Sequence, residues 1–147
     1  MRIAILTSPF FHDVKEITRM VDGKAIKGKD KIIFGGGERY LIDLCQLLQE
    51  DGHTVTVYQP FFGINTPFTK TYKGIPFVMI PNNGSSWEYS TCTDLNWQFN
   101  EFSALDDLRI YFTTFLAWPH AISPCIAVSH GIYWDAIQGN GIINNLN

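Results

Sequence analysis

The chain has 147 residues, of which 46% are hydrophobic and 17% are charged, and its formal net charge at pH 7 is -3. This length suits one globular domain with a buried core. A negative net charge gives no general reason to expect nucleic acid as a partner, and no apolar run is long enough for a membrane-spanning helix.

The cysteines and the N-terminus indicate a cytoplasmic protein. Cys45, Cys92 and Cys125 are odd in number and far apart, unlike the close pairs of a zinc or redox site or the pattern of a secreted scaffold. The N-terminus carries one positive charge and an apolar run too short for a signal peptide. We therefore expect reduced thiols.

The first half of the chain predicts a strand, a helix and a second strand. Residues 2–6 (RIAIL) form an apolar run typical of a buried strand. Residues 10–31 are polar and lysine-rich without a sustained period, and predict a loop or hairpin. Residues 38–51 repeat apolar side chains at helical spacing up to Gly52, a residue typical of a helix C-cap. Residues 54–58 (TVTVY) alternate as a strand does.

The second half adds three strands and one helix. Residues 74–80 predict a third strand, and residues 82–102 a loop leading into a short helix. Residues 108–115 and 125–129 predict two more strands. Nearly continuous apolar strands between crossovers are typical of a parallel sheet covered on both faces. We expect an α/β, Rossmann-like, mostly parallel sheet with helices on both faces.

Three consecutive glycines, Gly35, Gly36 and Gly37, come immediately before this first helix. Without Cβ atoms, their backbone can approach a phosphate or a sugar, and free N–H groups at a helix N-terminus attract anions. Such a site would lie at the carboxyl ends of the strands, where parallel α/β sheets bind ligands. The alternative is a flexible hinge after the preceding loop.

Glu38 and Arg39, the next two residues, also allow both a ligand-binding and a structural interpretation. Arg39 could hold an oxyanion with two hydrogen bonds. Alternatively, Glu38 complements the helix dipole in the first turn, and Arg39 pairs with Asp43 four residues later.

Two common nucleotide-binding motifs do not fit. The dinucleotide fingerprint G-x-G-x-x-G follows the first strand closely, whereas here a long segment intervenes and Tyr40 occupies the sixth position. The second strand continues into Gln59 and Pro60, where an acidic residue would bind the ribose. No Gly-Lys-Ser or Gly-Lys-Thr of a Walker loop occurs. We expect no nicotinamide cofactor.

Several of these segments together resemble a known family. The opening RIAILT, the segment GGGERYLIDLCQLLQEDGHTVTVY and a late strand running into HGIYWD resemble the N-terminal domain of glycosyltransferase family 4 (group 1), retaining enzymes with the GT-B fold. The resemblance covers most of the chain. It implies that residues 1–147 form the N-terminal, acceptor-binding half of two Rossmann-like domains that face each other across a cleft. The C-terminal domain, which holds most of the donor, would be absent from this chain.

The resemblance also implies roles for single residues. His130 would look toward the reacting sugar, and the glycine-rich loop would lie near the donor's diphosphate or the acceptor. The residues expected to bind substrate are Gly35, Gly36, Gly37, Glu38, Arg39 and Gly131. From position alone, His130 follows an apolar strand at the edge where ligands bind. The alternative is a structural histidine that bonds a loop carbonyl.

We therefore expect part of a retaining glycosyltransferase that moves a sugar from a nucleotide-sugar donor to a hydroxyl of a sugar, lipid-linked or small-molecule acceptor. The paired glutamates and basic residues that hold the donor in this family have no match here. The chain is accordingly expected to be inactive alone and to be the front part of a longer protein. One alternative is a stand-alone, non-catalytic module that binds carbohydrate or phosphate. Another is a nucleotide-sugar epimerase or other dinucleotide user, which predicts NAD binding.

The remaining candidates are side chains with simpler explanations. A lysine set could contact the anionic inner face of a membrane, although most such runs are solvated loops; its members are Lys24, Lys27, Lys29 and Lys31. Exposed aromatic residues could stack on sugar rings, although most anchor cores or loops; they are Trp87, Tyr89, Trp97, Trp118 and Trp134, with Trp118 and Trp134 preferred. His53 is expected to be structural. No histidine has a partner at metal-ligand spacing, and no metal is expected.

Overall fold

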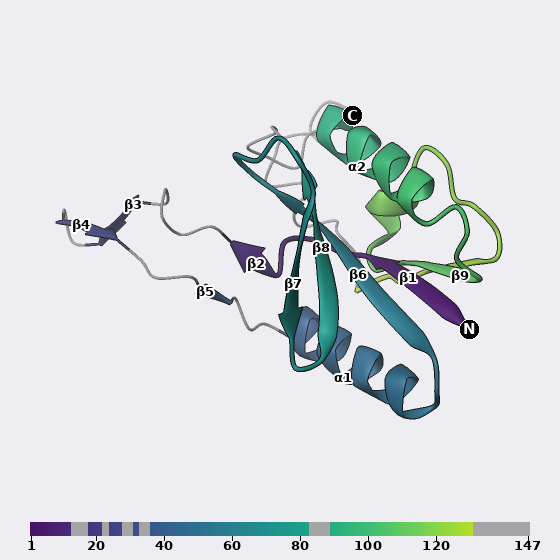
Figure 1. Cartoon of the computed structure of the whole chain (residues 1–147). Coiled ribbons are helices and arrows are strands. Elements are labelled where there is room, and N and C mark those ends of the chain that lie inside the picture. The colour runs from purple at the N-terminus through teal and green to yellow at the C-terminus, as the bar shows by residue number, and fades with distance from the viewer. Residues whose placement is uncertain (13–17, 22–23, 28–30, 33–35, 83–88, 131–147) are drawn as a thin grey trace, which may run out of the picture.

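A six-stranded sheet forms the centre of the computed structural model (Figure 1), in the order β10-β9-β1-β6-β8-β7. The structure describes residues 1–12, 18–21, 24–27, 31–32, 36–82 and 89–130. The strands of this sheet are β1 (Arg2–Leu6), β6 (Thr54–Phe61), β7 (Phe68–Tyr72), β8 (Ile75–Pro81), β9 (Leu108–Tyr111) and β10 (Cys125–Ala127), and the helices are α1 (Gly36–Glu50), α2 (Tyr89–Phe102) and the 3-10 helix η1 (Thr114–Ala117). All neighbouring strands pair in parallel except β7, which is antiparallel to β8.

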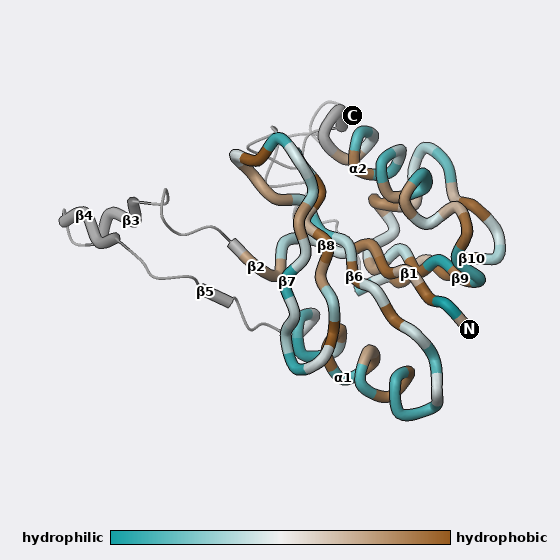
Figure 2. Tube along the Cα trace, in the orientation of Figure 1, coloured by the Kyte–Doolittle hydropathy of each residue, from teal (hydrophilic) through white to brown (hydrophobic). Residues whose placement is uncertain are grey.

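Each face of the sheet is covered by one α-helix. On β1, Ile3 and Ile5 pack with residues of α1, whereas Ala4 and Leu6 pack with residues of α2, because successive strand side chains point to opposite faces. Both helices alternate between hydrophobic and hydrophilic residues along their length (Figure 2), as helices that bury one face do. The expected α/β, Rossmann-like, mostly parallel sheet with helices on both faces is confirmed.

The end of α1 follows from the sequence. His53 donates its backbone N–H to the carbonyl of Leu48, and Gly52 donates to Gln49, both at 3.0 Å. This pair of bonds is the Schellman motif, which needs a left-handed residue at its turn. Gly52 supplies it with φ of +87°.

Several sequence-based boundaries need correction. The edge strand β7 was missed, although Phe68–Tyr72 alternates in burial. The strand expected over 108–115 ends at Tyr111, because the chain turns there into η1. The helix within 82–102 has 14 residues and is not short. In the segment expected to be a loop or hairpin, the described residues form two antiparallel pairs: β3 (Thr18–Val21) with β4 (Lys24–Lys27), and β2 (Phe11–His12) with β5 (Lys31–Ile32).

A buried polar network fixes the connection between β9 and β10. The amides of Asn96 and Asn100 in α2 both donate to the carbonyl of His120, at 3.0 and 2.8 Å. The Tyr111 hydroxyl donates to Asn100 Oδ1 and accepts the backbone N–H of Ile122. Because buried polar groups are costly when unpaired, this connection has one favoured path. It therefore positions β10 and the residues after it.

We expect Gly52→Ala to lower the free energy of unfolding by about 1 kcal/mol, because a Cβ disfavours the left-handed conformation. No atom lies within 4 Å of a Cβ added at Gly52, so the cost is conformational and not a clash. Urea denaturation monitored by circular dichroism measures the change.

Gly36→Ala is the matched control for this substitution. Its added Cβ also meets nothing within 4 Å, and its φ is not positive. The free energy of unfolding should stay unchanged or rise by up to about 1 kcal/mol, because alanine favours helices over glycine. Equal losses for the two variants would contradict the capping explanation.

Candidate functional site

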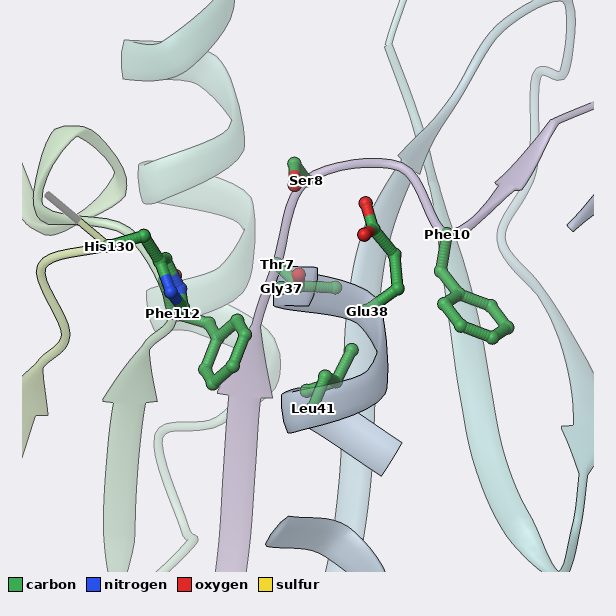
Figure 3. Close-up of a pocket in the computed structure, with 8 residues that line it drawn as sticks. All are labelled: Thr7, Ser8, Phe10, Gly37, Glu38, Leu41, Phe112 and His130. Atoms are coloured by element: carbon green, nitrogen blue, oxygen red, sulfur yellow. The ribbon is translucent and has the colours of Figure 1, made fainter. Parts of the chain in front are cut away.

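A small pocket lies at the carboxyl ends of β1 and β9, beside the first turn of α1 (Figure 3). Its volume is about 50 Å³. The residues that line it are Thr7, Ser8, Phe10, Gly37, Glu38, Leu41, Phe112 and His130. Three of the expected site residues, Gly37, Glu38 and His130, are thus brought together from distant parts of the sequence.

The strand ladder continues to the edge of this pocket. Phe112 donates its backbone N–H to the carbonyl of Leu6 at 2.8 Å, and Thr7 donates to Tyr58 at 2.9 Å. Residues immediately beyond β1 and β9 therefore lie side by side. This is the edge at which parallel α/β sheets bind ligands.

Gln59 of β6 holds the segment that follows β1. Its Oε1 accepts the backbone N–H groups of Phe10 and Phe11 at 3.0 and 2.8 Å. Its Nε2 donates to the carbonyls of Phe11 and Pro60. The Gln59 side chain is fully buried, and its amide is occupied by backbone groups. This side chain therefore shapes the pocket and does not stand where it could bind a ribose.

The described part of the fold does not require glycine at the start of α1. Neither Gly36 nor Gly37 has a positive φ, and a Cβ added at either would meet nothing within 4 Å. No described part of the chain therefore needs glycine at these two positions. The described residues leave the space for a Cβ beside this backbone unfilled. Gly35 lies outside the described residues.

His130 is held at the pocket by two contacts with Phe112. Its Nε2 bonds the carbonyl of Phe112, and because a carbonyl only accepts, Nε2 carries the hydrogen. Its ring packs against that of Phe112 with centroids 4.5 Å apart. In the neutral ring, Nδ1 is then the nitrogen that accepts a hydrogen bond. His130 therefore bonds a backbone carbonyl, as the structural alternative expects, and it also lines the pocket.

Of the neighbouring residues Glu38 and Arg39, Glu38 lines the pocket and Arg39 does not. The Glu38 side chain lines the pocket, and Figure 3 shows its carboxylate pointing toward the segment that carries Ser8. Arg39 is exposed and is not among the lining residues, so substrate binding by Arg39 stays a prediction. Gly131 lies outside the described residues.

Sequence reasoning missed Tyr40 as a neighbour of the pocket. The ring of Tyr40 stacks on that of Phe112 with centroids 5.4 Å apart and lies 6.2 Å from the ring of His130. Half of Tyr40 remains exposed. Thr7 and Ser8 were also missed, although their position directly after the first strand was a usable signal. No sequence signal pointed to Tyr40 or Phe112.

Other candidates lie elsewhere or outside the described residues. Trp97 and Trp118 are about half exposed, at 56% and 48%, and stacking on a sugar stays a prediction for them. Trp87, Trp134 and Lys29 are not described. Within the described ranges, no group of three or more His, Cys, Asp or Glu is arranged to hold a metal. In the same part of the chain, no helix has the length and apolarity to cross a membrane.

The contacts of His53 and the state of the three cysteines bear on two further expectations from the sequence. His53 contacts the N-terminal amine and Asp51, at 3.0 and 3.4 Å, in keeping with a structural residue. The three cysteines are free. Burial raises the pKa of the Cys45 thiol to about 12, so this thiol stays protonated at neutral pH and is a poor nucleophile.

A comparison of the chain with protein-family models, curated protein sequences and solved structures finds no match.

We expect Gln59→Leu to lower the free energy of unfolding by about 2 to 4 kcal/mol, because two backbone N–H groups lose a buried acceptor. Urea denaturation measures the free energy of unfolding. Gln49→Leu is the matched control, since Gln49 makes one exposed bond to the carbonyl of Gly74. It should change stability by about 0.5 kcal/mol or less. Similar losses for both variants would show that Gln59 does not hold the segment.

Proposed function

We propose that this chain is the N-terminal, acceptor-side domain of a retaining glycosyltransferase, which moves a sugar from a nucleotide-sugar donor to a hydroxyl acceptor. The observation that carries the proposal is the pocket that gathers Gly37, Glu38 and His130 at the carboxyl edge of a Rossmann-like sheet. These are residues that the resemblance to glycosyltransferase family 4 singles out. Their proximity is what an acceptor-side surface requires.

The size of the pocket supports a shared site. Pockets that enclose a small molecule usually measure about 300 to 1,000 Å³, whereas this one measures about 50 Å³. It can hold one group of a ligand and leaves the remainder uncovered. A second domain that closes over the same edge would supply the missing wall, as in a two-domain transferase.

The chemistry of the pocket suits an acceptor more than a complete active site. The hydroxyls of a sugar can form hydrogen bonds in this pocket with the hydroxyls of Thr7 and Ser8, the Glu38 carboxylate and His130 Nδ1. Transfer also needs groups that stabilise the departing diphosphate. In this proposal those groups belong to the donor-binding domain, so the chain by itself transfers sugar negligibly.

A stand-alone binding module is the alternative function. The coding sequence beyond Asn147 distinguishes the transferase from the binding module, because the transferase requires a second Rossmann-like domain with paired glutamates there. A panel of nucleotide sugars, tested with the two-domain protein, also distinguishes these two functions. A transferase is protected from thermal unfolding by its donor and then releases the nucleoside diphosphate when an acceptor is added. Protection without release would favour the binding module.

We expect Gly36→Leu to abolish transfer in the two-domain protein while the fold persists. The described residues leave space for a Cβ at Gly36, so in this proposal the larger side chain obstructs the ligand and not the described core. Product release and the melting temperature measure the two effects. Unchanged turnover would remove the glycine run from the site.

We expect His130→Ala to lower turnover about tenfold, because one hydrogen bond to the reacting sugar is lost. His120→Ala is the matched control, since His120 is exposed and stacks on Trp97 away from the pocket. Turnover and melting temperature, measured for both variants, show whether His130 acts in transfer or only in stability. A large melting shift with normal turnover in His130→Ala would identify a purely structural histidine.

A further inference from the structure

Tyr40 is a half-exposed aromatic side chain beside the pocket. It stands three residues after Gly37 and one before Leu41 in α1, and both of these residues line the pocket. Helix side chains lean toward the N-terminus of their helix. The Tyr40 side chain therefore leans toward the turn that contains Gly37.

One face of the Tyr40 ring is covered by Phe112. The two rings lie at 23° with centroids 5.4 Å apart, which is the geometry of a stacked pair. Phe112 is buried, and its backbone N–H donates to the carbonyl of Leu6. A fixed support thus lies behind Tyr40, and the exposed half of the residue belongs mainly to the outer face and edge of its ring.

The His130 ring packs on the same support. Its centroid is 4.5 Å from that of Phe112 and 6.2 Å from that of Tyr40. One buried phenylalanine therefore places the outer face of Tyr40 next to a histidine that lines the pocket. The structural alternative is that Tyr40 only covers Phe112.

The size of the pocket indicates what a ring at its rim would contact. A volume of about 50 Å³ holds one substituent of a ligand, since a water molecule takes about 30 Å³ in the liquid. The rest of such a ligand lies outside the pocket, against residues at the rim. Tyr40 is at this rim, because its ring lies next to those of Phe112 and His130.

A pyranose matches both the pocket and the ring beside it. One hydroxyl or hydroxymethyl substituent can enter the pocket, where the hydroxyls of Thr7 and Ser8 donate or accept hydrogen bonds. The C–H groups of the sugar ring form an apolar face, which packs on an aromatic plane. An acyclic polyol offers similar hydroxyls without this face.

We infer that Tyr40 is a ligand-binding residue of this site. Its outer ring face packs against the C–H face of a pyranose that places one substituent in the pocket, and Phe112 holds the Tyr40 ring in position. For the biological role of the sugar, this inference rests on the proposed transferase. It narrows the acceptor to a molecule that carries a pyranose.

The first test compares cyclic and acyclic ligands. Amide NMR signals of residues 8, 37, 40 and 130 are followed in the 147-residue chain while methyl glucopyranoside, methyl galactopyranoside, methyl mannopyranoside or sorbitol is added. At least one pyranoside should shift these signals and bind about threefold to tenfold more tightly than sorbitol. Equal or tighter binding of sorbitol, or no response to any pyranoside, would overturn the inference. Tighter binding of uridine or adenosine would assign the ring face to a base and also overturn it.

Two substitutions test the residue itself. Tyr40→Leu removes the ring and keeps an apolar side chain over Phe112, so pyranoside binding should weaken about threefold to tenfold. Tyr40→Phe keeps the ring face and should bind within about twofold of the original chain. Unchanged binding in Tyr40→Leu would leave only the structural alternative.

Phe102→Leu is the matched control for these variants. Phe102 in α2 is 45% exposed and stacks on Tyr58 at 27° with centroids 5.9 Å apart, and it is not among the lining residues. Each leucine variant loses one stacked pair, so the two melting temperatures should fall by similar amounts. Only Tyr40→Leu should lose pyranoside binding. Equal losses of binding would show a general effect of lower stability and overturn the role of Tyr40.

These outcomes are independent of the transferase assay. If pyranoside binding requires Tyr40 but no nucleotide sugar yields product in the two-domain protein, the proposed enzyme fails and the binding residue stands. If product forms and Tyr40→Leu leaves the KM for the acceptor unchanged, the transferase stands and the assignment of Tyr40 fails.

Discussion

The backbone hydrogen bonds of β1 with β6 and β9 determine where the candidate pocket of this molecule lies. Leu6 lies opposite Tyr58 on one side and Tyr111 on the other. Because these strands reach the same edge in register, the residues that follow them are neighbours. Thr7 and Phe112 border one pocket for this reason. A shift in register would separate them and remove the pocket.

Two further constraints give this edge its present shape. Gln59 ties the backbone of Phe10 and Phe11 to β6, which fixes one wall. The network of Asn96, Asn100 and Tyr111 fixes the connection that leads to β10, and so indirectly fixes His130. Both devices are buried and polar, so their geometry is specific: an alternative path would leave polar groups unpaired. The pocket is therefore built by the fold and not by a flexible loop alone.

Much of the fold was predictable because local patterns and tertiary structure agree. Apolar runs identified β1 and β8, helical spacing identified α1, and Gly52 marked its end. The failures occur where packing decides. β7 is a short, half-exposed edge strand whose partner makes it a strand, and the residues after Tyr111 follow η1 because α2 holds them.

The site was predictable in part for a similar reason. Gly37 and His130 both stand at element boundaries, and the rule that ligands meet strand ends places them at one edge. Only the three-dimensional structure shows that no described residue requires glycine at Gly36 or Gly37. The same holds for the Tyr40 and Phe112 rings beside His130, because their contacts join residues far apart in the sequence. The place of Glu38 in the pocket lining depends on the direction of its side chain, which spacing does not define.

The central claim is that another molecule occupies the open space beside Gly37 and His130. Amide hydrogen exchange of the two-domain protein, with and without nucleotide sugar and acceptor, tests it most directly. The account predicts slower exchange in residues 7–8, 36–38 and 130 when both substrates are present. Protection confined to other surfaces, such as the β7 edge or α2, with unchanged exchange at these residues would contradict it.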